Sequence, residues 1–218
     1  MNDDTQSFSF TQDPSSLTKI LKVFLWISVG VGALAVVSDI AQLTLLTGGP
    51  VGLAEANAND ARQGLVGIIS IITFIITGIT FLRWVYRANV NCHGFGAQNM
   101  QFTPGWAVGF YFVPILSFFK PCEAMVEIWK ISQDPMNWEN QSNDALVGVW
   151  WSLFLVSNIA GNISIQTALR AKDPETLTLS TVAAIISTIA GIALDIVAVS
   201  LVSKILKMQQ KLVNRYSH

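Results

Sequence analysis

The chain has 218 residues, of which 51% are hydrophobic and only 12% are charged, and its mean hydropathy is +0.48. This composition is typical of a membrane protein and argues against a soluble domain. The formal net charge of -1 excludes a basic field that would hold nucleic acid, and two cysteines are too few for a disulfide framework.

The first 19 residues are polar and slightly acidic, unlike the basic start of a secretory signal peptide, and we interpret them as a cytoplasmic tail. Four apolar runs long enough to cross about 30 Å of hydrocarbon follow. The predicted spans cover about residues 20–47, 64–87, 145–169 and 177–202. They belong to a single membrane domain, residues 20–206, and residues 207–218 are expected to form a basic cytoplasmic tail.

The segment between the second and third spans decides the topology. Residues 106–119 are apolar, but this run is short for a span, and Pro114 at its centre prevents one straight helix. We therefore predict a proline-broken hairpin, re-entrant or interfacial, that leads into an amphipathic helix, so that the whole segment covers residues 104–132. The alternative is a full crossing, which would give five spans.

The placement of lysine and arginine tests these alternatives, because short cytoplasmic loops carry an excess of both. With four spans and both termini inside, ten of these residues lie on the cytoplasmic side and three outside. A full crossing leaves six inside and seven outside, with no bias. The sequence therefore favours an all-α integral membrane protein with four transmembrane helices and both termini in the cytoplasm.

Residues 122–132 have the pattern of a short amphipathic helix, with Glu123 and Glu127 one turn apart on one face. Arg83 and Arg87 are also one turn apart, at the inner end of the second span. We hypothesise an Arg–Glu network that joins the interfacial helix to this span. Independent, solvated charges are the alternative.

A family resemblance is carried by the stretch PGWAVGFYFVPILSFFKPCEAMVEIW, residues 104–129, together with upstream Trp84, Arg87, Asn91 and the turn at residues 94–97. These residues resemble the signature of uncharacterised bacterial multi-pass membrane proteins grouped as domain of unknown function DUF4328. Cys122 departs from this pattern, which has an aromatic residue there. The resemblance implies a protein of the bacterial inner membrane, and it brings no activity or catalytic residue. The candidate functional residues of the stretch are Arg83, Trp84, Arg87, Asn91, Pro104, Gly105, Trp106, Pro114, Pro121, Glu123, Glu127 and Trp129.

Four polar residues inside the predicted spans are further candidates, namely Asp39, Asn158, Asn162 and Asp195. Ionisable groups within a membrane are costly and are functional hypotheses by default. Asp39 and Asp195 are expected near opposite faces of the membrane, in packing roles or in an ion path. Asn158 and Asn162 share one face of the third span, where interhelical hydrogen bonds are expected.

No catalytic motif, cofactor or metal site is predicted, since Cys92, His93 and Cys122 do not have zinc-ligand spacing. The favoured function is a non-enzymatic membrane module that senses the bilayer or assembles with partners. Its expected partners are membrane lipids, together with a second copy of the chain or another membrane protein, and no nucleic acid is expected. A small transporter or channel-forming oligomer is the alternative function, and a lipid-modifying enzyme that uses Glu123, Glu127 or His93 is the third.

Overall fold

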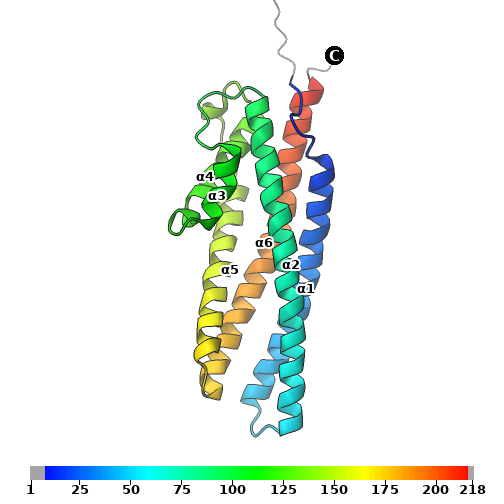
Figure 1. Cartoon of the computed structure of the whole chain (residues 1–218), viewed down its shortest axis with the longest axis vertical. Helices are drawn as coiled ribbons and strands as arrows, with labels where there is room; N and C mark the ends of the chain where they lie inside the picture. The colour runs from blue at the N-terminus through cyan, green and yellow to red at the C-terminus, as the bar shows by residue number, and fades with distance from the viewer. Residues whose placement is uncertain (1–7, 216–218) are drawn as a thin grey trace, which may run out of the picture. The chain divides into compact units, whose positions relative to one another are not determined.

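The computed structural model describes residues 8–215, and these residues are all-helical, without strands (Figure 1). The ends of the two predicted tails, residues 1–7 and 216–218, lie outside the described residues. The α-helices are α1 (Ser15–Thr47), α2 (Leu53–Gly94), α3 (Pro104–Gly109), α4 (Lys120–Gln133), α5 (Ala145–Arg170) and α6 (Pro174–Arg215). Three short 3-10 helices, η1 (Phe110–Phe112), η2 (Leu116–Phe118) and η3 (Trp138–Asn140), lie between them.

Four helices, α1, α2, α5 and α6, are long and apolar enough to cross a membrane, which confirms the four predicted spans. The fifth crossing finds no support, because the longest helix within residues 104–119 is α3, with six residues. Helices α2 and α6 have 42 residues each. At a rise of about 1.5 Å per residue they are about 63 Å long, roughly twice the hydrocarbon thickness of a bilayer. Each therefore has a segment outside the membrane.

The chain forms two compact units. The first, which we name the motif unit because it holds the candidate motif residues, consists of the described parts of residues 1–22, 78–149 and 198–218. The second, the span unit, consists of residues 23–77 and 150–197.

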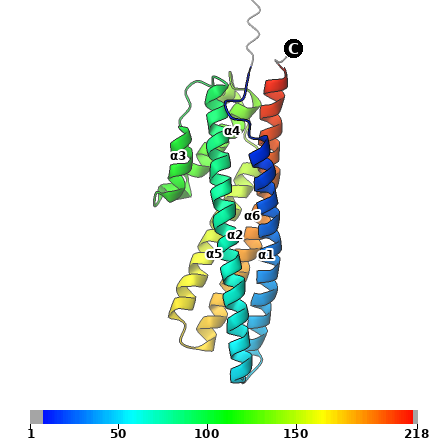
Figure 2. The ribbon, with the colours of Figure 1, turned by 45° about the vertical axis from the view of Figure 1, so that its right-hand side comes forward.

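The motif unit has an apolar core like that of a water-soluble helical domain. Helix α4 is amphipathic and buries Met125, Ile128 and Ile131. The segment of α2 in this unit contributes Trp84, Ala88 and Cys92, which follow one another at four-residue steps on one helix face. Short helix α3 packs against α4, as Figure 2 shows.

The span unit has the opposite distribution of side chains. Large apolar side chains such as Phe74 and Ile165 are exposed, as expected for helix faces in contact with lipid. Its helices approach each other through small residues: a Cβ added to Gly32 would come within 2.8 Å of the Ile192 side chain. Ser157 and Ser187 each donate a hydrogen bond to the other's carbonyl oxygen, at 3.1 and 2.8 Å.

Candidate functional site

An N-terminal segment, residues 8–14, which we name the strap, packs across the ends of α2 and α6 within the motif unit. Phe8 and Phe10 lie against Phe95, with ring centroids 5.9 and 6.0 Å apart. The approach to α2 is close enough that a Cβ added to Gly94 would meet the Thr11 hydroxyl oxygen at 2.0 Å. Any other residue at position 94 would require the Thr11 side chain to move.

Three motif side chains of α2 hold this N-terminal region through hydrogen bonds, and the pairs are Asn91 with Gln12, Arg87 with Asp13, and Trp84 with Thr18. The three side chains come from adjacent turns of α2, so they share a helix face. Asn91 satisfies the Gln12 backbone on both sides, accepting from its N–H and donating to its carbonyl at 2.9 Å each. The motif spacing thus fixes the position of a segment more than 70 residues away in sequence.

A groove of about 370 Å³ lies between the strap, α2 and α3. Its lining residues are Gln12, Ile79, Leu82, Arg83, Tyr86, Arg87 and Val108. The Arg87 guanidinium donates one hydrogen bond, of 2.9 Å, to the Asp13 carbonyl. Hydrogen bonds from Ser15 lower the pKa of the Asp13 carboxyl, and the charges of Arg87 and Lys19 add to this effect. The Asp13 carboxylate is therefore the anion already present near Arg87.

The hypothesised Arg–Glu network is wrong for the described residues. Glu123 pairs instead with Lys120 at 2.6 Å, one turn before it on α4. Glu127 accepts hydrogen bonds from backbone N–H groups, and Arg87 donates to a backbone carbonyl. Each of the two side chains bonds to backbone groups distant in sequence, and no ion pair joins them in the part of the chain that the structure describes.

Glu127 is buried and serves as an acceptor for the loop before α3. Its carboxylate accepts from the N–H groups of Gln101 at 2.6 Å and Phe102 at 3.2 Å. His93 Nε2 lies 3.1 Å from the Phe102 carbonyl oxygen, so both the N–H and the carbonyl of Phe102 are hydrogen-bonded to side chains. Burial raises the pKa of Glu127, while the two N–H groups and the nearby His93 oppose this rise. Both carboxylate oxygens are thus engaged in holding the loop, which differs from an open acid–base site.

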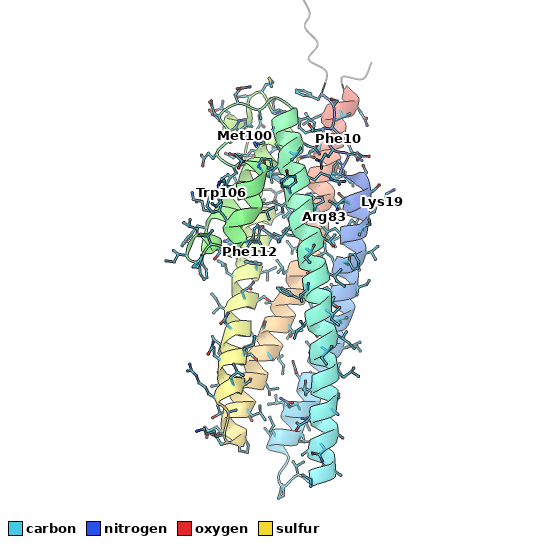
Figure 3. The ribbon with its side chains drawn as sticks, viewed as in Figure 1. Phe10, Lys19, Arg83, Met100, Trp106 and Phe112 are labelled. Carbon is cyan, nitrogen blue, oxygen red and sulfur yellow. The ribbon has the colours of Figure 1, made fainter. Side chains whose placement is uncertain are left out.

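Residues 104–119, which we name the aromatic hairpin, carry the most exposed apolar surface of the motif unit (Figure 3). Pro104 occupies the first turn of α3, with Thr103 as its N-cap. The exposed large side chains of the hairpin are Trp106, Phe112, Ile115, Leu116, Phe118 and Phe119, and Ile115 reaches 73% exposure. A Cβ on Gly105 would meet nothing within 4 Å, so packing does not explain this glycine.

The tip of the hairpin has an unusual backbone conformation. Pro114 accepts a hydrogen bond of 2.8 Å from the Leu116 N–H, which closes a three-residue turn around Ile115. Ile115 has φ +69° and ψ -52°, the geometry of a γ-turn that is strained for a β-branched residue. The strained residue presents its apolar side chain outward.

The remaining motif residues, Pro121 and Trp129, are buried in α4 and support the core. Pro121 lies in the first turn of α4, where its missing N–H costs nothing. Trp129 lies under the Lys204 ammonium of α6, 5.8 Å from the ring centroid. Lys204 also pairs with Asp144 at 3.3 Å, so one cation links α6 to the start of α5 within the motif unit.

The two thiols are free, and no group of three metal-ligating side chains occurs among the described residues. Burial raises the pKa of Cys92, and burial also raises that of Cys122. Both shifts favour the thiol over the reactive thiolate.

A polar network that the sequence interpretation missed joins α1, α2 and α6 within the span unit. Gln42 is central, because it accepts from Asn59 at 3.2 Å and donates to the Thr181 hydroxyl at 2.8 Å. Arg62 donates to Asn59, to the Ser38 hydroxyl and to the Ser38 carbonyl. A signal was present, since Ser38 and Gln42 on α1 and Asn59 and Arg62 on α2 have helical spacing.

The four predicted intramembrane polar residues do not gather into one site. Asp39 accepts from Gln63 at 3.3 Å, whereas Asp195 is bonded to Ser28. Asn158 and Asn162 are exposed on α5, and Asn158 donates to the Phe154 carbonyl of its own helix. Among the described residues this asparagine face therefore makes no hydrogen bond to a neighbouring helix, in contrast to the expectation.

Comparison with known proteins adds a family and no activity. No curated protein matches the chain, and no solved structure matches it. The family model for the domain of unknown function DUF4328 matches residues 49–207, which include all of α2 and α5 and most of α6. Since this match covers well over half of the 218 residues, the chain belongs to the DUF4328 family.

Proposed function

We propose that the protein is a non-enzymatic membrane module that senses the surface of one leaflet through its aromatic hairpin. Four helices anchor it in the bilayer, and the motif unit holds the hairpin at the point where the apolar run of α2 ends. The exposed apolar surface of residues 106–119 is the observation that carries the proposal. Soluble surfaces seldom keep such a contiguous patch, whereas interfacial segments use it to enter the boundary between headgroups and acyl chains.

The support behind the hairpin favours this role over a disordered loop. Glu127 bonds the loop that precedes the hairpin, and the buried face of α4 follows it. Aromatic contacts stabilise the first part of the hairpin. The ring centroids of Trp106 and Phe110 are 4.9 Å apart, and those of Phe110 and Phe102 are 6.0 Å apart. A rigid base lets the hairpin present its apolar side chains without paying the ordering entropy at each encounter with lipid.

Site-specific quenching in vesicles tests the proposal. In a Cys92→Ala, Cys122→Ser background, a single cysteine replaces Ile115 and is labelled with an environment-sensitive fluorophore. The label should be quenched by a quencher attached to lipid acyl chains and protected from aqueous iodide. A label at exposed Glu139, in the same unit, is the matched control and should show the reverse.

Two results would contradict the proposal. Iodide quenching at position 115 equal to that at position 139 would place the hairpin in water. Protection from both quenchers would indicate a protein contact instead, and would favour assembly with a partner over sensing of the bilayer.

A further inference from the structure

The groove beside the strap has an apolar part followed along α2 by a cationic part, which matches the acyl chain and the phosphate of a phospholipid. Ile79 and Leu82 are the last turn of an uncharged run that starts at Leu65. Arg83 and Arg87 follow directly and line the same groove. The floor of the groove therefore belongs to a segment suited to hydrocarbon, and its cations begin where that segment ends.

The guanidinium groups of Arg83 and Arg87 have N–H donors that no hydrogen bond among the described residues uses. Arg83 is exposed and has no ion pair among the described residues. Arg87 uses one donor for the Asp13 carbonyl, whereas a guanidinium has five N–H donors in a planar fork. Tyr86 also lines the groove, and its hydroxyl is one further hydrogen-bond donor. Phosphate oxygens match such a fork better than a single ammonium does.

From this arrangement we infer that the groove binds one anionic glycerophospholipid, with its phosphate on Arg83 and Arg87 and the start of an acyl chain along Ile79, Leu82 and Val108. The inference rests on the proposed contact of the motif unit with the bilayer and names the lipid class that it recognises. An acidic peptide would satisfy the cations but would leave the apolar floor without a partner. The Asp13 carboxylate sets an upper limit on affinity, because it already lies near Arg87.

Native mass spectrometry of the detergent-extracted full chain, titrated with phosphatidylglycerol or phosphatidylcholine, tests the inference. The wild type should retain phosphatidylglycerol in preference to phosphatidylcholine. Since one basic side chain near a membrane surface contributes about a fivefold gain in binding of an anionic lipid, Arg83→Gln should lower phosphatidylglycerol retention about fivefold. Val108→Trp, which fills the groove without changing charge, should lower retention of both lipids.

The matched control is Arg170→Gln, which removes an exposed arginine at the end of α5, outside the motif unit. Equal phosphatidylglycerol retention by wild type and Arg83→Gln, or an equal loss in Arg170→Gln, would overturn the site. Competition by inorganic phosphate alone, with no preference between lipids, would also overturn it in favour of a free anion. Quenching of the Ile115 label in phosphatidylcholine vesicles should be unchanged in Arg83→Gln, so a failed headgroup site remains distinguishable from a failed membrane contact.

Discussion

The two units bury apolar and polar residues in different proportions, because apolar side chains dominate the buried residues of the motif unit and polar ones make up half of those in the span unit. The motif unit buries large apolar side chains, among them Trp84, Phe95, Met125, Ile128, Ile131, Leu201 and Ile205. The span unit buries Leu25, Ser38, Asn59, Thr77, Trp150, Trp151, Ser180, Thr181, Ala183 and Ala190, of which five are Ser, Thr or Asn. Lipid is as apolar as leucine, so apolar burial cannot hold the span unit together, and hydrogen bonds and close packing take its place.

The largest expected effect is in the apolar core of the motif unit. Ile128→Ala should lower the free energy of unfolding of this unit by about 2–5 kcal/mol, because Ile128 is fully buried and its removal leaves a cavity. Thermal unfolding in detergent, monitored by hydrogen exchange in α4, measures this loss of stability. Ile159→Ala, on the exposed face of α5, is the matched control and should change stability by less than about 0.5 kcal/mol. Similar losses in both variants would mean that both units are held by apolar burial.

A second pair of variants tests the polar core of the span unit. Asn59→Leu should destabilise by about 2 kcal/mol, since it removes the acceptor of Arg62 and the donor to Gln42 and leaves both without that partner. Asn162→Leu makes the same change on the exposed face of α5 and should be close to neutral in detergent. Hydrogen exchange in α1 and α2 reports the difference. A stabilising Asn59→Leu would show that this network is not required for packing.

The buried carboxyl of the motif unit should make stability depend on pH. Glu127→Gln removes one acceptor from the pair of N–H groups of Gln101 and Phe102, and we expect a loss of about 1–2 kcal/mol. Because burial raises the pKa of Glu127 above its ordinary value of 4.5, its contribution to stability is full below that pH and is lost as pH rises through the folded pKa. The advantage of wild type over Glu127→Gln should therefore be larger at low pH than at neutral pH. Urea titrations at the two pH values check the sign, and a reversed trend would mean that the N–H groups outweigh burial.

The sequence was sufficient for features that depend on local pattern. The apolar runs predicted the four spans, and the amphipathic spacing predicted a short helix at 122–132, against the observed Lys120–Gln133. The length of the run around Pro114 correctly indicated a segment that does not form a fifth span. Each of these inferences needs only the period of a helix and the thickness of a bilayer.

Features that depend on distant or backbone partners were not predictable in the same way. The opposite charges of Glu127 and Arg87 favoured an ion pair, but both side chains bond to backbone groups instead. Every residue has such groups, so the sequence does not indicate which of them will be the partner. Phe8 and Phe10 gave a weak signal as aromatic residues in a polar tail, and their partner Phe95 lies more than 80 residues away. The polar network was not predicted, because it depends on how α1 and α2 pack: Arg62 of α2 bonds to Ser38 of α1 and to Asn59.

The smallest expected effect concerns the hairpin tip, which belongs to the motif unit yet exposes an apolar side chain. Ile115→Ala and Ile115→Gly both remove that side chain, but only glycine adopts φ +69° without a Cβ clash. Ile115→Gly should therefore be more stable than Ile115→Ala by about 1 kcal/mol in detergent. Thermal unfolding of the two variants measures the strain, and a contact assay with vesicles measures the lost side chain, which should weaken membrane contact equally in both. Equal stability would mean that the turn around Ile115 relaxes at no cost, so that its outward direction is not imposed by the fold.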